Sequence, residues 1–189
     1  MKKLIVAVML VAASALVVAQ TFEQSVEAYL RKDYAAAFAG LMKWAERGDA
    51  IAQFNLGVMY ADGTGVPKDD QLAVDWYRKA AEQGQAIAQF NLGVMYASGR
   101  GVPKDDRLAV DWYRKAAEQG QANAQFNLGV MYADGTGVPK DDELAYFWYL
   151  LSSAQGDQDG LRNRDIIEKR LTPQQRASAQ LSARTWKPK

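Results

Sequence analysis

Apolar residues recur at helical spacing along most of this chain, and they predict two kinds of helix that alternate. In residues 50–61, Ala52, Leu56 and Tyr60 recur every four positions and therefore share one face of a helix. A second apolar face lies in residues 70–83, and its members are Ala73, Trp76, Tyr77 and Ala80. We expect these faces to form the core, with Trp76, Trp112 and their tyrosine neighbours buried in it.

Glycine, proline and acidic residues mark the ends of these two helices. The segment 62–67 contains two glycines and a proline, which end the first helix and form a loop. An aspartate of the segment 68–70 is expected as the N-cap of the second helix. Gly84 follows that helix where a C′ glycine is expected. On its charged face, Asp75 and Lys79 stand at the favourable i,i+4 spacing, which predicts an ion pair.

The helix pair is repeated with a period of 36 residues. Residues 86–121 repeat residues 50–85 with three substitutions, and a third copy that begins at Ala122 stays close as far as Ala145. A fixed period of this length is the signature of a solenoid, in which stacked copies bury each other's apolar faces. The sequence therefore predicts an all-α fold, a right-handed α-α superhelix of about ten helices stacked in antiparallel pairs.

The repeated residues resemble a known family. The first two copies carry Ala–Gln–Phe–Asn–Leu–Gly–x–x–Tyr, then Gly–x–Gly–Val–Pro–x–Asp, then Ala–x–x–Trp–Tyr–x–x–Ala–Ala–x–x–Gly. This order and spacing resembles the Sel-one-like repeat (SLR) family, a relative of the tetratricopeptide repeat with a longer loop between its helices. The resemblance runs from about Tyr34 to the C-terminus, with both ends degenerate. It implies a solenoid whose first helices line a concave surface.

The N-terminal segment predicts export. Residues 1–19 combine two lysines with an apolar run and end in small residues, which is typical of a secretory signal peptide cleaved before Gln20. The alternative is an uncleaved anchor, although the apolar run is short for a membrane-spanning helix. We expect an exported protein, periplasmic or secreted, with no stable membrane insertion after cleavage. Because the chain has no cysteine, no disulfide or lipoprotein anchor is expected.

The remaining chain, residues 20–189, is expected to form one domain. Its predicted parts are a degenerate N-terminal pair (22–49), three repeats (50–85, 86–121 and 122–157) and C-terminal capping helices (158–186). In the last repeat, four large apolar residues replace polar or small ones: Tyr146, Phe147, Leu150 and Leu151. They are expected to lie under the C-terminal segment, or else to form an exposed patch for a partner.

The final helix has a clear start signal. Thr172 is expected as the N-cap, Pro173 as the first helical residue and Gln175 as the partner that completes a capping box. Three apolar side chains are candidates for docking this helix on the last pair: Ala177, Leu181 and Trp186.

Charge is unevenly distributed along the chain. Residues 20–157 carry 13 basic and 19 acidic residues, whereas residues 158–189 carry 8 basic and 3 acidic ones. The basic end has two interpretations, a contact for an anionic polymer or membrane surface, or a solvated set of helix ends. So mild a balance in an exported protein does not indicate a nucleic-acid partner.

Composition argues against most catalytic and metal chemistry. The chain lacks histidine and cysteine, which removes a typical zinc site and histidine-based catalysis. Its serines offer no Ser–x–x–Lys, and the Gly63–Thr64–Gly65 loop lacks the remainder of a phosphate-binding motif. The aspartates of the loop at 62–70 do not have the spacing of a calcium loop. The sequence therefore predicts no enzyme, no cofactor and no metal.

The strongest candidate site is a stripe on the first helix of each repeat, opposite the Ala52 face. Its twelve residues are Ile51, Asn55, Val58, Asp62, Ile87, Asn91, Val94, Ser98, Asn123, Asn127, Val130 and Asp134. The asparagines form a ladder one repeat apart, and an amide can donate to and accept from the backbone of an extended peptide. The alternative is that these asparagines are ordinary helix surface copied by duplication.

These observations favour a non-enzymatic protein-interaction module or scaffold that binds a partner protein or peptide on its concave face. Two alternatives remain. One is a scaffold that binds through its convex face. The other, suggested by the resemblance alone, is a cell-wall-related enzyme or enzyme inhibitor, including the β-lactamase annotation of some relatives.

Overall fold

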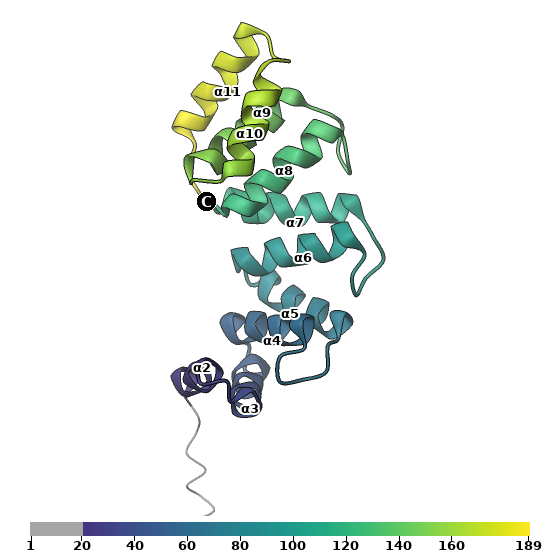
Figure 1. Cartoon of the computed structure of the whole chain (residues 1–189), viewed down its shortest axis with the longest axis vertical. Coiled ribbons are helices and arrows are strands. Elements are labelled where there is room, and N and C mark those ends of the chain that lie inside the picture. Colours follow the sequence, from purple (N-terminus) through teal and green to yellow (C-terminus); the bar gives the residue numbers. More distant parts are fainter. Residues whose placement is uncertain (1–20) are drawn as a thin grey trace, which may run out of the picture.

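The computed structural model describes residues 21–189, and the predicted signal peptide at residues 1–19 lies outside this range. Within it the chain forms ten α-helices and no strand (Figure 1). The helices are α2 (Phe22–Leu30), α3 (Tyr34–Glu46), α4 (Ala50–Asp62), α5 (Asp70–Glu82), α6 (Ala86–Ser98), α7 (Asp106–Glu118), α8 (Ala122–Asp134), α9 (Asp142–Ala154), α10 (Gln158–Glu168) and α11 (Pro173–Thr185). The fold is the all-α repeat solenoid that the period predicts.

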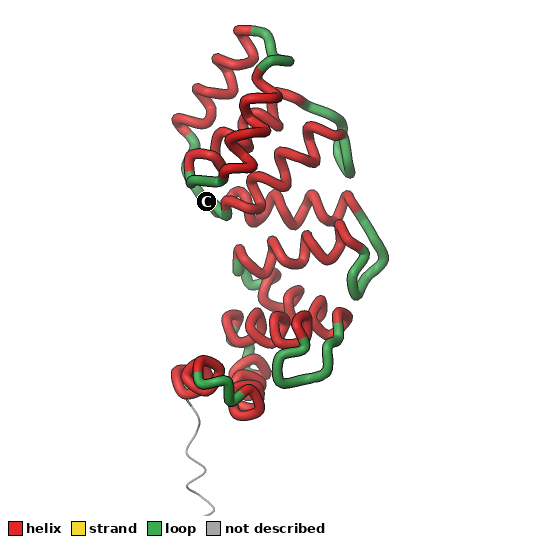
Figure 2. The backbone as a smooth tube through the Cα atoms, in the orientation of Figure 1, coloured by secondary structure: helices red, strands yellow, loops and turns green. Residues whose placement is uncertain are grey.

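Helices that are consecutive in the sequence pack side by side. Each repeat contributes a pair, α4 with α5, α6 with α7 and α8 with α9, and each pair packs on the next. The array curves, so that α2 and α11 both lie on its left side in Figure 1. Long loops join the two helices inside a repeat, and short turns join one repeat to the next (Figure 2).

The helix ends confirm the predicted caps. The Asp69 side chain accepts hydrogen bonds from the backbone N–H groups of Gln71 and Leu72, at 2.9 and 3.0 Å. Gly84 has a φ of +89°, which only glycine adopts at little cost. Its N–H donates to the Ala81 carbonyl, and the next N–H donates to the carbonyl of residue 80, which is a Schellman turn. The second helix therefore turns sharply into the next repeat.

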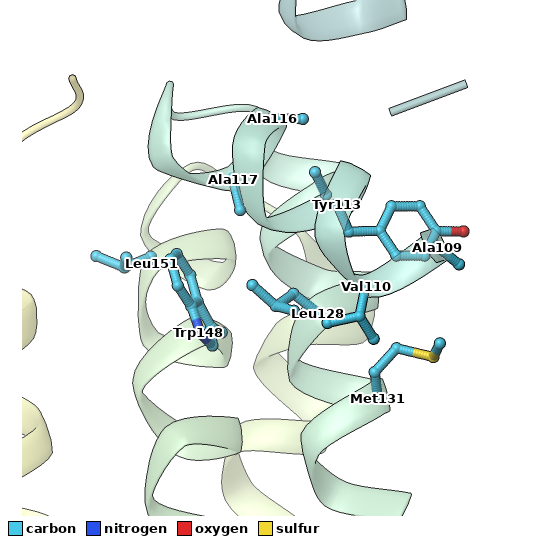
Figure 3. Close-up of a cluster of buried hydrophobic side chains, with 10 residues drawn as sticks. Ala109, Val110, Tyr113, Ala116, Ala117, Leu128, Met131, Trp148 and Leu151 are labelled. Carbon is cyan, nitrogen blue, oxygen red and sulfur yellow. The ribbon is translucent and has the colours of Figure 1, made fainter. Parts of the chain in front are cut away.

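Buried side chains form a cluster at each level of the stack. The cluster around α7, α8 and α9 holds Leu128 at its centre, with no exposed surface. Figure 3 shows Trp148 and Leu151 on one side of this cluster and the ring of Tyr113 on the other. Because α7 belongs to one repeat and α8 and α9 to the next, burial links neighbouring repeats.

The expected burial of the tryptophans is wrong for the first two repeats. Tyr77 and Tyr113 are core residues at 4% exposure, but Trp76 and Trp112 are only half-buried. A lysine one turn further along lies 4.0 Å from the centroid of each indole ring, in a cation–π contact. The tryptophans therefore lie at the edge of the core, with a charged group over the ring.

The expected ion pair between Asp75 and Lys79 is not the contact that forms. Asp75 instead pairs with Arg78, at 3.2 Å between Oδ1 and Nη1. Lys79 is the lysine over the Trp76 ring. The Arg78 guanidinium reaches the Asp75 carboxylate from three residues away. The Lys79 ammonium instead lies over the indole ring, where the cation–π contact stabilises it.

The apolar residues of the last repeat lie under the C-terminal helices, as expected. Tyr146 and Leu151 are buried, and α10 and α11 both pack on α9. The Tyr146 hydroxyl accepts a hydrogen bond from the side-chain amide of Gln180 at 3.1 Å. The capping box of Thr172 and Gln175 at the start of α11 is also formed.

The contacts that dock α11 differ from those expected. Leu181 is 64% exposed and Ala177 is exposed, whereas Ala179 is buried. Ala179 and the half-buried Ala183 make the contacts of this helix with the core clusters. Trp186 does pack on the core, against the cluster that contains Trp148.

The end of the chain folds back onto the array. The Lys189 backbone N–H donates to the Glu118 carbonyl at 2.9 Å, and its ammonium pairs with the Glu118 carboxylate at 2.8 Å. The tail therefore joins α11 to the end of α7, which is far from it in the sequence. Between residues 21 and 189, no helix combines the length and apolar character needed to cross a membrane.

Candidate protein-interaction surface

The stripe predicted from the sequence lies along α4, α6 and α8, and its members differ in exposure. Ile51 and Ile87 are 53% and 49% exposed, and Asn123 takes the same register in the third repeat. The last members, Asp62, Ser98 and Asp134, are also exposed. The structure thus leaves both ends of each four-residue row open to solvent.

The valines of the stripe have a packing role. Val58, Val94 and Val130 are half-buried, and each contacts the core cluster that its own repeat forms with the next one. Only part of each side chain is available to a partner. The valines therefore contribute more to repeat packing than the sequence pattern indicates.

Two asparagines of the stripe are hydrogen-bonded to the preceding repeat. Asn91 bonds the hydroxyl of Tyr77, and Asn127 bonds the hydroxyl of Tyr113. Burial raises the pKa of both tyrosines to about 12, and the asparagine bond lowers it by a smaller amount. The amides thus pair with the phenol groups of buried tyrosines at the junction between repeats.

Asn163 is a further member of this ladder that the sequence reasoning missed. Its side-chain amide lies 3.4 Å from the hydroxyl of Tyr149, whose pKa burial likewise raises to about 12. The signal is in the sequence, because Asn163 follows Asn127 by one repeat length. The degenerate residues around it in α10 conceal the match.

Asn55 has no equivalent tyrosine. The residue one repeat before Tyr77 is Leu41, so the asparagine of the first repeat faces a leucine instead of a phenol. Asn55 lies in the wall of a pocket of about 330 Å³, together with Leu41, Val58 and three other apolar or aromatic residues: Val26, Tyr29 and Phe54. Two residues of the predicted stripe therefore line a cavity between α2, α3 and α4.

A ladder of glutamines holds the repeats together on another side of the array. Gln89 donates to the Ala81 carbonyl at 3.1 Å and accepts from Gln119 at 2.7 Å. The same bonds recur around Gln53 and Gln125, and all three glutamines are buried. These glutamines recur every 36 residues in the sequence. The spacing of apolar residues, however, does not show whether a glutamine is buried or exposed.

The acidic loop residues are engaged in local contacts. Asp69 caps α5, and Asp70 pairs with Arg100 of the next repeat at 2.7 Å. The Arg100 guanidinium lowers the pKa of the Asp70 carboxyl. Among residues 21–189, no group of three or more histidine, cysteine, aspartate or glutamate side chains has the arrangement to hold a metal ion.

The basic C-terminal end is partly neutralised by its neighbours. Arg162 pairs with Asp159, and Arg164 pairs with Asp165 at 2.7 Å. Lys189 pairs with Glu118, as described above. These pairs reduce the field that an anionic surface would meet at this end.

Comparison with known families agrees with the repeat register. The Sel1 repeat matches residues 50–85, 86–121 and 122–157, which is more than half of the chain. The chain belongs to the Sel1 repeat family. Proteins of this family are generally protein-interaction modules. None of the curated proteins matches this chain.

Two solved structures share this Sel1 repeat fold. A Sel1 repeat protein from Oxalobacter formigenes is 38% identical, with a TM-score of 0.74, over 77% of this chain and 60% of that one. A protective antigen of uropathogenic Escherichia coli strains, which displays an SLR fold, is 37% identical with a TM-score of 0.74. That match covers 86% of this chain and 38% of the antigen. This Sel1 repeat chain therefore spans less than two thirds of either relative.

Proposed function

We propose that this Sel1 repeat protein is a non-enzymatic scaffold that binds a partner protein or peptide through the stripe on α4, α6 and α8. In tetratricopeptide-like solenoids the first helices line the concave face, and we propose the same position for the partner here. The observation that carries the proposal is the repeated exposure of a large apolar side chain at one register, Ile51 and then Ile87. Exposed apolar residues that recur in a row are typical of an interaction surface.

The polar members of the stripe would set the selectivity of binding. Exposed Asp62 and Asp134 stand at the ends of their rows, and Ser98 takes that place in the middle row. Asn123 replaces isoleucine in the third row. The surface thus changes from apolar to polar along the array, which favours a partner whose segment is apolar at one end and polar or basic at the other.

Affinity measurements with substituted protein test this proposal. The partner would be captured from the protein's own cell extract and its affinity measured by titration calorimetry. Ile51→Ser with Ile87→Ser should weaken binding by about tenfold or more, because the apolar surface that these two exposed side chains would bury against the partner is lost. Isoleucine is a sharper choice than asparagine here, since Asn91 also bonds Tyr77.

The matched control lies on the second helix of the pair. Asp75→Ala with Lys79→Ala changes two exposed residues of α5 and should leave the affinity unchanged. Loss of binding in this control, together with normal binding by the isoleucine variant, would move the interaction to the outer helices.

We also propose that the protein is exported to the periplasm or beyond it. The support is the sequence of residues 1–19, where two lysines precede an apolar run that ends in small residues. N-terminal sequencing of the protein recovered outside the cytoplasm should begin at Gln20. A chain that still begins at Met1 there would contradict cleavage.

A further inference from the structure

A tyrosine and an asparagine meet at most junctions between helix pairs, and one junction lacks the tyrosine. Three times, the second helix of a pair supplies a tyrosine whose hydroxyl meets an asparagine of the next first helix. The tyrosines are Tyr77, Tyr113 and Tyr149, and the asparagines are Asn91, Asn127 and Asn163. At the junction between α3 and α4 the asparagine is present as Asn55, but Leu41 stands in place of the tyrosine.

The missing tyrosine coincides with a larger pocket. Leu41, Asn55 and Val58 line a cavity of about 330 Å³. Three repeat lengths further on, the equivalent residues Tyr149, Asn163 and Ile166 are part of the lining of a cavity of about 150 Å³. The cavity beside Leu41 is the larger of the two, and the Asn55 side chain is part of its wall.

The walls of the larger pocket suit an aromatic side chain. Tyr29 and Phe54 contribute aromatic rings, and Val26, Leu41 and Val58 contribute aliphatic surface. Aromatic pairs add to the gain from burial alone. Asn55 supplies an amide to the lining that can exchange a hydrogen bond with a hydroxyl, as its equivalents do with tyrosine.

We propose that this pocket receives a tyrosine side chain of the partner protein, which occupies the place that Tyr77 has at the next junction. This inference rests on the proposed function, since Asn55 and Val58 belong to the stripe. At the last junction the equivalent asparagine, Asn163, donates to the Tyr149 hydroxyl at 3.4 Å, and Asn91 and Asn127 lower the pKa of Tyr77 and Tyr113 as hydrogen-bond partners. Residues 1–20 contain no tyrosine, so they cannot supply the phenol.

Two amino-acid probes that differ by one hydroxyl test the proposal. N-acetyl-tyrosinamide and N-acetyl-phenylalaninamide would be titrated into the ¹⁵N-labelled protein, with the side-chain amide of Asn55 followed by NMR. The tyrosine probe should shift this amide and bind roughly twofold to tenfold more tightly than the phenylalanine probe, which is the net worth of one hydrogen bond. In Asn55→Ala the preference for tyrosine should disappear.

Filling the pocket from inside the chain gives a second test. Leu41→Tyr restores the residue of the other junctions, so it should raise the melting temperature and abolish binding of the tyrosine probe. Val58→Phe narrows the pocket from another wall and should also abolish probe binding. Leu181→Tyr, on the exposed face of α11, is the matched control and should bind the probe normally.

The outcomes separate this inference from the proposed function. Equal binding of the two probes, no shift at Asn55, or normal probe binding by Leu41→Tyr would overturn the tyrosine pocket. If the captured partner is lost from the isoleucine variant but still binds Leu41→Tyr with full affinity, the stripe binds it and the pocket inference is wrong. If the probe binds at Asn55 but the isoleucine variant keeps full affinity for the partner, the proposed function fails instead.

Discussion

At the residue scale, each second helix sets two aromatic neighbours in different environments. Tyr113 is buried against Gly93 and has 4% exposure, whereas Trp112 is half-buried with Lys115 over its ring. Both residues fall on the apolar face that the periodicity predicts. The sequence could not distinguish their burial, because helical spacing shows which face of the helix a side chain lies on and not how deeply that side chain is buried.

The two aromatic residues should differ in their contribution to stability. Tyr113→Ala is expected to lower the free energy of unfolding by about 3–5 kcal/mol, the usual cost of removing a buried aromatic ring. Trp112→Ala should lower it by only about 1–2 kcal/mol, because partial burial and an exposed cation–π contact are lost. Urea unfolding of both variants measures this, and a larger loss in Trp112→Ala would contradict the burial described above.

The three buried tyrosines also predict how stability depends on pH. Burial raises the pKa of Tyr77, Tyr113 and Tyr149 to about 12, above the ordinary tyrosine value of about 10. The folded chain thus keeps protons that the unfolded chain loses above pH 10. Their contribution to stability is complete below about pH 10 and is lost as the pH rises through about 12.

Denaturation at a series of alkaline pH values should show this loss. The stability of Tyr113→Phe should fall less steeply between pH 10 and 12, because one proton fewer is released on unfolding. A titration of phenol absorbance at 295 nm that shows every tyrosine ionising near pH 10 would contradict the raised values.

At the scale of the element, the glycine of each first helix permits close packing of the pair. A Cβ added at Gly93 would lie 2.7 Å from Cδ1 of Tyr113 and 3.3 Å from the Ala109 carbonyl oxygen. The equivalent additions at Gly57 and Gly129 would meet Tyr77 and Tyr149 in the same way. The helices approach at these points because no side chain separates them.

Gly93→Ala should therefore destabilise the protein, against the preference of helices for alanine. We expect a loss of about 1–3 kcal/mol, since the added methyl group overpacks the site. In a Tyr113→Leu background the same substitution should cost less, because the aromatic ring that it meets is absent. Equal losses in both backgrounds would show that the tyrosine is not the obstacle.

Helix ends and their caps were predictable from sequence, whereas the polar contacts between repeats were not. The aspartate before α5, the glycine after it and the capping box of Thr172 all act within a few residues, so local patterns reveal them. The bond between Gln89 and Gln119 joins residues 30 positions apart. The bond between Asn91 and Tyr77 likewise depends on how the pairs stack, which a single repeat does not specify.

At the scale of the whole molecule, the two ends of the array are covered unequally. Helix α2 buries only Ser25 and Ala28 of its nine residues, and Leu30 is 75% exposed. At the other end, six of the 13 residues of α9 are buried, and α10 and α11 both pack on this helix. The sequence predicted that both ends are degenerate. It did not predict that the tail returns to Glu118, because that contact spans 71 residues.

Hydrogen exchange should reveal that the N-terminal end of the array is less buried than the C-terminal end. Backbone amides of α2 are expected to exchange first, followed by those of α3, while amides of α6 to α9 are protected longest. Mass spectrometry of peptides from an exchange series measures the order. Equal protection of α2 and α8 would contradict an array that frays from its N-terminal end.

The repeated junction has a consequence for how such a gene can change in length. If residues 86–121 were deleted, Gln85 would stand directly before Ala122, and its side chain could cap that helix as Gln121 does now. Tyr77 would meet Asn127 in the way that it meets Asn91. A whole repeat could thus be lost with most contacts at the new junction already matched, although Thr136 would stand where Arg100 now pairs with Asp70. The number of repeats available to a partner would then change while the two ends of the protein stay the same.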